Sequence, residues 1–193
     1  MKINKDIIAK LNPCKNRFDN YLEYYSDFDG DLREFLELEN ITYDDKVWVF
    51  ERNTTKEQRM KWAALCAKSV LHLFEERYPN DKRPRNAIEA TLNNNITSEI
   101  KRNAADAAFA TAYAADAYAA AYAADAAFAA AYAADADAAA YAADAAAYAA
   151  DAAAYATYAA AAYAADAAAD AAAADTARQK QQCYNLSMML EVL

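Results

Sequence analysis

Residues 141–155 read YAADAAAYAADAAAY, and they are the most regular part of a tract that runs from residue 104 to residue 175. Of those 72 residues, 49 are Ala, 10 are Asp, nine are Tyr, two are Phe and two are Thr. Alanine has the highest intrinsic helix propensity, and neither Gly nor Pro interrupts the tract. The composition therefore predicts helix throughout the tract, and an all-α fold class for the chain.

Tyr and Asp recur at two spacings within this tract. Up to Tyr141 the aromatic–Ala–Ala–Asp unit returns every nine or ten residues, and from Tyr141 to Tyr155 it returns every seven. Seven residues are close to two helical turns, so Tyr141, Tyr148 and Tyr155 should share one helix face. A single helix over the tract would be about 108 Å long, so we expect at least one reversal, near residues 135–137. An extended rod is the alternative.

Alanine offers little side chain to bury, so the conventional core is expected in residues 1–103. The clearest amphipathic helix there follows Thr54, which forms a capping-box pattern with Glu57. This helix should end before Pro79, and Pro84 should open the next helix. The predicted apolar face of the helix that follows Thr54 consists of Met60, Ala63, Ala64, Ala67, Val70, Leu71 and Phe74.

The remaining segments complete a compact multi-helix bundle in this prediction. Residues 27–31 hold the only glycine, Gly30, and should form a turn. The Ala-rich helices should pack on the N-terminal half, with tyrosines filling gaps between them and bonding Asp on a neighbouring helix. A C-terminal apolar stripe should dock there too, so that residues 1–103 and 104–193 form one folding unit. That stripe contains Leu186, Met189, Leu190 and Leu193.

The net charge of −9 is carried by the second half of the chain. Residues 1–103 contain 18 basic and 18 acidic side chains, whereas residues 104–193 contain two basic and 11 acidic ones. An acidic surface cannot neutralise a phosphate backbone, which argues against long nucleic acid as a partner. The aspartates keep an apolar helix soluble, or, as the alternative, mimic nucleic acid. They also argue against a membrane span, because each would be costly in hydrocarbon.

Residues with reactive side chains are few and scattered. Cys14, Cys66 and Cys183 form no CxxC pair, and the single histidine, His72, lies among apolar residues where packing is expected. We therefore expect no metal, no cofactor and no catalytic residue. The N-terminus lacks the apolar segment of a signal peptide, which favours a cytoplasmic protein with reduced thiols.

The densest charged cluster surrounds Arg83-Pro84-Arg85. Glu75 and Glu89 lie within reach as ion-pair partners that would orient both arginines. Such a cluster either locks a helix–helix corner or holds a phosphate or carboxylate ligand, since a guanidinium binds both in a bidentate manner.

Two stretches around this cluster resemble a known family. Residues 70–75 read VLHLFE and residues 78–90 read YPNDKRPRNAIEA, followed by Ala-rich helix. In these motifs the chain resembles the type-five-like immunity protein family over roughly residues 11–175. Residues 12–14 and 28–30 resemble its phage versions. Members interleave Trp and Arg through their Ala helices, where this chain has Tyr and Asp. The resemblance implies that the protein neutralises a toxin or a defence component by binding.

We therefore expect a non-enzymatic immunity-like or phage counter-defence protein. Its partner would be a toxin, an immune effector or a small anionic, nucleotide-like signal. The alternative is a structural protein whose Ala helices self-associate into a homo-oligomer. Rows of Tyr and Asp on the Ala helices would add to the contact surface. The predicted contact residues are Arg83, Arg85, Glu75, Glu89, Tyr113, Tyr122, Tyr132, Tyr141, Asp116 and Asp125.

Overall fold

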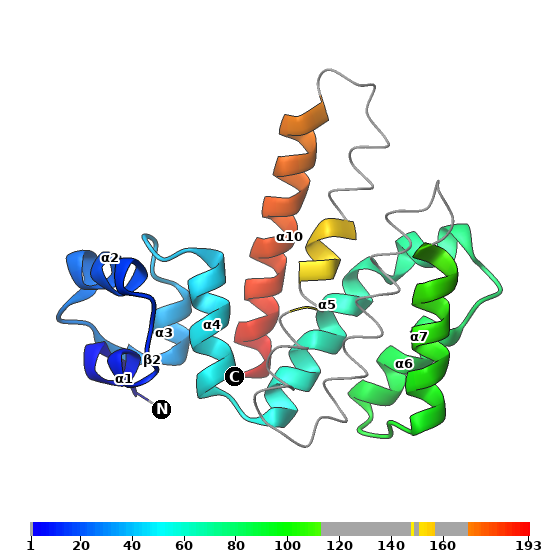
Figure 1. Ribbon diagram of the computed structural model, residues 1–193, viewed down its shortest axis with the longest axis horizontal. Helices are drawn as coiled ribbons and strands as arrows, with labels where there is room; N and C mark the ends of the chain where they lie inside the picture. Colours follow the sequence, from blue (N-terminus) through cyan, green and yellow to red (C-terminus); the bar gives the residue numbers. More distant parts are fainter. Residues whose placement is uncertain (1, 113–147, 149–150, 157–169) are drawn as a thin grey trace.

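The protein is described by a computed structural model in which residues 2–112, 148, 151–156 and 170–193 are placed (Figure 1). Helices dominate these residues, which confirms the all-α class. The elements are β1 (Lys2–Asn4), α1 (Lys5–Lys10), α2 (Lys15–Tyr25), β2 (Asp29–Asp31), α3 (Leu32–Leu36), α4 (Tyr43–Asn53), α5 (Lys56–Arg77), α6 (Arg83–Leu92), α7 (Ser98–Ala112) and α10 (Asp170–Val192).

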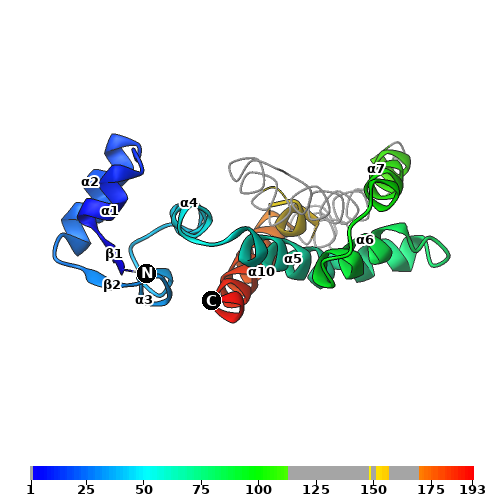
Figure 2. The same ribbon diagram turned by 90° about the horizontal axis from the view of Figure 1, so that it is seen from below.

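The elements lie roughly in a row (Figures 1 and 2). The strands and helices α1–α3 form one end, and α6 and α7 form the other. Helices α4, α5 and α10 lie between them, and α5 packs against both α6 and α10. The two ends are therefore connected through α5, which packs on α6, and through α10, which packs on α3, α4 and α5.

The N-terminal end contains a short antiparallel pair that the sequence did not predict. Strand β1 pairs with β2 so that Ile3 lies opposite Gly30, and the predicted turn around Gly30 is wrong in this respect. A Cβ atom on Gly30 would lie 2.6 Å from Oε2 of Glu34 and from the ring of Phe28. A side chain at this position would thus displace Glu34 or Phe28, whereas the backbone of Gly30 does not have a positive φ.

The helix boundaries follow local capping. Thr42 caps α4, where its hydroxyl accepts a hydrogen bond from the backbone N–H of Asp45. The capping box of α5 is formed by Thr55 and Gln58, one residue later than expected, because the Thr54 hydroxyl instead donates to the carbonyl of Phe50 at 2.6 Å. Helix α5 ends at Arg77, before Pro79, and Pro84 lies in the first turn of α6, as predicted.

All seven residues of the predicted apolar face of α5 are buried. Trp62 and Phe74 are the largest fully buried side chains of α5, while Ala63, Ala64 and Ala67 leave room for neighbouring backbones. Cys66 is also fully buried, and burial raises the pKa of its thiol well above the usual value. This face forms the centre of the main apolar cluster.

Part of the alanine tract joins the same cluster. Residues 151–156 are helical, and Ala153 and Ala156 are fully buried. Tyr148 and Tyr155 lie on the outside, with 54% and 48% of their surface exposed. The prediction that tyrosines fill gaps between helices is therefore wrong for these two, because about half of each side chain's surface is exposed.

The alanine tract and the C-terminal helix are not one continuous rod. Residues 151–156 lie beside α10 in both views (Figures 1 and 2). A straight helix would separate Ala153 from Met189 by about 54 Å. The reversal expected near residues 135–137 lies outside the described residues.

Helix α10 docks on the N-terminal half as predicted. Met188 and Met189 are buried, Leu186 and Leu190 are partly buried, and Leu193 is exposed. Free carbonyls at the end of the helix are satisfied by other elements, because Arg33 donates to the Leu190 carbonyl at 2.7 Å and Gln58 to that of Val192 at 3.2 Å.

A polar network within the core links α10 to α4 and α5. Asn185 is fully buried, and its Nδ2 donates to the hydroxyl of Tyr43 at 3.2 Å. Its side-chain oxygen accepts from Gln181 at 3.0 Å, and its carbonyl accepts from Nε1 of Trp62 at 3.1 Å. Gln181 also donates to Ser69 at 2.7 Å. Burial strongly raises the pKa of Tyr43, so this hydroxyl remains protonated.

We predict that Asn185→Ala lowers the free energy of unfolding by about 2 kcal/mol, because it leaves buried partners of the amide without a hydrogen bond. Urea denaturation followed by circular dichroism measures the change. Ser187→Ala, at an exposed position of the same helix, is the control and should change stability by less than about 0.5 kcal/mol. Equal effects of the two substitutions would show that the network does not stabilise the fold.

Candidate functional site

The predicted charged cluster is located where α5 ends and α6 begins. Glu75 lies in the last turns of α5 and Arg85 in the first turn of α6. Tyr78 terminates α5, and the short connection that follows allows α6 to pack back against it. We call Glu75, Asp81, Lys82, Arg83, Arg85 and Glu89 the α5–α6 corner.

Arg85 is held by a bidentate ion pair with Glu75. Its Nε lies 2.7 Å from Oε1 and its Nη2 lies 2.5 Å from Oε2. Glu89 is 3.7 Å from Nη1 of the same arginine, and Lys82 is 3.6 Å from Glu75. Glu75 and Glu89 thus orient Arg85, as expected.

Arg83 pairs with a different carboxylate from those predicted. Its Nε and Nη2 bind the two oxygens of Asp81 at 2.9 and 2.6 Å, and its backbone N–H donates to Asp81 at 3.1 Å. The expectation that Glu75 and Glu89 orient both arginines is wrong for Arg83. Asp81 is two residues away, so the pair forms within the connection itself.

The ion pairs shift the titration of both carboxylates. Hydrogen bonds from Arg85 hold the pKa of Glu75 below its usual value, and those from Arg83 do the same for Asp81. The pKa of Arg83 is raised mainly by its hydrogen bond to Asp81. The charge of Asp106, on α7, raises it further by a smaller amount. The three cationic side chains of the corner therefore lie among its three carboxylates, and Asp106 is a fourth carboxylate nearby.

Such a corner is a rigid charged surface whose guanidinium groups already have carboxylate partners. The side chains of Arg83 and Arg85 are nevertheless 37% and 42% exposed. They can therefore contact a partner while their own carboxylates hold them in place.

The other predicted contact residues lie outside the described residues. These are Tyr113, Tyr122, Tyr132, Tyr141, Asp116 and Asp125. His72 is exposed, so the expectation that it is packed is wrong, because its position on α5 turns away from the buried face. The three cysteines are free thiols, with Cys14 and Cys183 exposed.

Two further findings concern the described part of the chain alone. Its His, Cys, Asp and Glu side chains form no group of three suited to hold a metal ion. None of its helices combines the length and the apolar character needed to cross a membrane.

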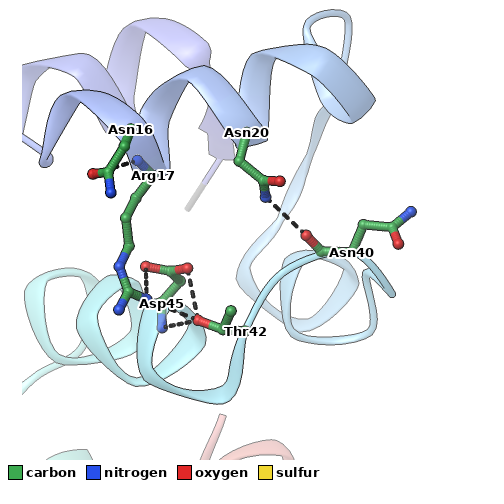
Figure 3. A network of polar contacts seen from close by, with 6 residues as sticks. All are labelled: Asn16, Arg17, Asn20, Asn40, Thr42 and Asp45. Atoms are coloured by element: carbon green, nitrogen blue, oxygen red, sulfur yellow. Dashed lines mark hydrogen bonds and ion pairs between the residues drawn. The ribbon is translucent and has the colours of Figure 1, made fainter.

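A second candidate site, which the sequence did not indicate, is a cavity between α2 and α4. Arg17 of α2 reaches across to α4, where its Nη1 lies 3.0 Å from both Asp45 and the hydroxyl of Thr42 (Figure 3). Asn20 donates to the carbonyl of Asn40 at 3.0 Å beside it. A cavity of about 240 Å³ lies next to this bridge.

Comparison with known proteins identifies one family. Residues 51–188 match the family model described as "Imm-5 like putative immunity protein", which is 138 of the 193 residues. The match begins and ends later than the resemblance expected over residues 11–175. It contains the α5–α6 corner and leaves the first 50 residues outside. Comparison with curated proteins and with solved structures gave no match.

We predict that acid weakens the corner. Above about pH 5 both carboxylates are ionised, and their stabilising contribution is lost as the pH falls through their lowered native pKa values. The free energy of unfolding of the wild type should therefore fall between about pH 5 and pH 3. In Glu75→Gln the fall should be smaller, and the difference between wild type and variant should be at most about 1 kcal/mol because the ion pair is exposed. Urea titrations at each pH measure this.

The control for this experiment is Glu76→Gln, which removes the same charge from the adjoining exposed position of α5 and leaves the Arg85 pair intact. It should show the pH dependence of the wild type. A Glu75→Gln profile identical to that of the control would contradict a stabilising corner.

Proposed function

We propose that this chain, which belongs to the Imm-5-like immunity protein family, is a non-enzymatic inhibitor that binds and neutralises a toxin or an immune effector protein. The family match over residues 51–188 is the observation that carries the proposal. The match includes α5, α6, α7 and most of α10, so the proposed activity belongs to these helices and not to the end formed by β1, β2 and α1–α3.

The α5–α6 corner is the contact surface that we propose within this segment. Its arginines are held by bidentate pairs, so little side-chain freedom is lost when a partner binds. An acidic group of the partner would share Arg83 and Arg85 with Asp81 and Glu75. Arginine held in this way contributes strongly to protein interfaces.

A protein target fits the corner better than a small anion. The guanidinium groups are occupied by Glu75 and Asp81, and Asp106 adds negative charge nearby. A free phosphate would have to displace these carboxylates, whereas a protein surface can meet alternating charges with its own. Exposed Tyr148 and Tyr155 lie in the same matched segment and offer aromatic contacts of the kind that interfaces favour.

The predicted Tyr and Asp contacts between residues 113 and 141 are part of this proposal. They belong to the same Tyr/Asp pattern as Tyr148 and Tyr155. We therefore propose these residues as further contacts, in addition to Tyr148 and Tyr155.

Self-association is a second candidate function, favoured by exposed aromatic rings in the second half of the chain. Tyr148, Tyr155 and Tyr184 have 54%, 48% and 55% of their surface exposed. Light scattering of the purified protein tests it: a concentration-dependent assembly that Tyr148→Ser with Tyr155→Ser abolishes would support this function, and a monomer at all concentrations would contradict it.

We predict that replacing both corner arginines weakens inhibition. Cells that co-express the protein with candidate toxins identify the toxin that it neutralises, and calorimetry then measures binding. Arg83→Ala with Arg85→Ala should weaken binding at least about tenfold, whereas Arg52→Ala, an arginine of α4, should leave it unchanged. Circular dichroism confirms that each variant is folded.

Two outcomes would contradict separate parts of this proposal. Equal binding by the wild type and the folded double variant would remove the corner from the contact surface and leave the inhibitor function standing. A wild-type protein that protects against none of the toxins and binds no effector would remove the inhibitor function itself.

A further inference from the structure

The cavity between α2 and α4 lies outside the segment that matches the immunity family. All of its lining residues fall between Ile8 and Val49, whereas the match begins at residue 51. Whatever this cavity does is therefore independent of the proposed inhibitor function. Either can fail without the other.

The interior of the cavity is apolar and largely aromatic. Buried side chains from α1, α2, α3 and α4 form its floor, and the half-buried rings of Phe18 and Trp48 line it further out. The floor consists of Ile8, Tyr21, Phe35, Ile41 and Val49. An enclosed apolar cavity of about 150 Å³ holds a benzene ring. A volume of about 240 Å³ therefore accommodates one ring with a short side chain.

The floor is not packed like a completed core. Tyr21 is only 3% exposed, and its hydroxyl is buried with no hydrogen-bond partner among the described residues. Burial raises the pKa of Tyr21 to about 12. Buried hydroxyl groups without a partner are rare in finished interiors. The space beside it is thus an unfilled site with a polar group in its wall.

The mouth carries one carboxylate that has no cation. Cys14, Arg17 and Asp44 are the exposed lining residues, with Asp45 half-buried beside them. Arg17 is neutralised by Asp45 in the bridge shown in Figure 3. Asp44 takes part in no ion pair among the described residues, and its charge contributes, after burial, to the raised pKa of Asp151. The mouth is therefore electronegative.

From these features we infer that the cavity binds a small organic cation, in which an aromatic ring enters the apolar interior and an amine remains at the mouth beside Asp44. The ring would pack between Phe18 and Trp48. The guanidinium of Arg52 already stacks over the ring of Trp48 at 4.4 Å, so this tryptophan is fixed in orientation. The Arg17–Asp45 bridge keeps the two helices that carry these rings at a constant separation.

The test uses three probes of nearly equal size and different charge: phenethylamine, 2-phenylethanol and phenylacetate. Calorimetry should show phenethylamine binding to the full chain about tenfold more tightly than the neutral alcohol and more tightly still than the acid, the size expected for one exposed carboxylate. Phenethylamine should also slow the reaction of Cys14 with a thiol reagent, while the exposed Cys183, on α10, reacts at an unchanged rate.

Asp44→Asn is the decisive variant because its side chain is exposed and the substitution leaves the apolar floor unchanged. It should bring the affinities of phenethylamine and 2-phenylethanol within about threefold of each other. Asp6→Asn is the matched control, since Asp6 also lies in the first turn of a helix and does not line the cavity. It should keep the wild-type preference.

Three results would overturn the inference. The first is an absence of binding by all three probes together with unchanged reactivity of Cys14. The second is phenylacetate binding as tightly as phenethylamine. The third is a preference for the amine that Asp44→Asn preserves, since the charge at the mouth would then not be what the ligand recognises.

Discussion

The buried face of α5 is the constraint on which the rest of the structure depends. Alanine helices have no bulky side chains with which to hold one another, so their burial requires a partner that supplies volume and still permits close approach. Helix α5 does both, because Trp62 and Phe74 provide volume while the small side chains of Ala63, Ala64 and Ala67 let neighbouring backbones come close. Ala153 and Ala156 are buried in the same cluster. Residues 151–156 of the low-complexity tract thus gain their hydrophobic stabilisation in a cluster whose large side chains come from conventional helices.

Polar contacts then determine how the helices are arranged around α5. Methyl groups pack almost equally well in several registers, whereas the amide of Asn185 bonds Tyr43 of α4 and Gln181 of its own helix, and its carbonyl accepts from Trp62 of α5. A shifted α10 would leave these buried groups without partners, each at a cost of about 1–3 kcal/mol. The network therefore gives α10 a unique position that apolar packing alone would not define.

Local features of the sequence predicted local structure, and they failed where partners are distant in the chain. The α5 face follows from apolar residues at helical spacing, and the boundaries at Pro79 and Pro84 follow from proline sterics. The predicted capping box is one residue too early because the sequence offers two equivalent patterns. Thr54 precedes Glu57 by three residues, and Thr55 precedes Gln58 by three residues. The corner was predicted in part: Glu75 and Arg85 were paired correctly, whereas Asp81 was missed as the partner of Arg83. The bonds from Arg17 to Asp45 and from Asn185 to Tyr43 span 28 and 142 residues, and no local pattern indicates them.

The two charged regions of the molecule differ in a way that separates their roles. At the α5–α6 corner every arginine is already matched by a carboxylate, so the surface gains little from a small free ion and is suited to an extended surface with charges of its own. At the mouth of the cavity, the Arg17–Asp45 pair cancels and Asp44 is left over beside an apolar interior. A single unbalanced charge next to a hollow of limited volume selects a small ligand of opposite charge. Charge balance, rather than the number of charged residues, is therefore what distinguishes the proposed protein-binding surface from the proposed small-molecule site.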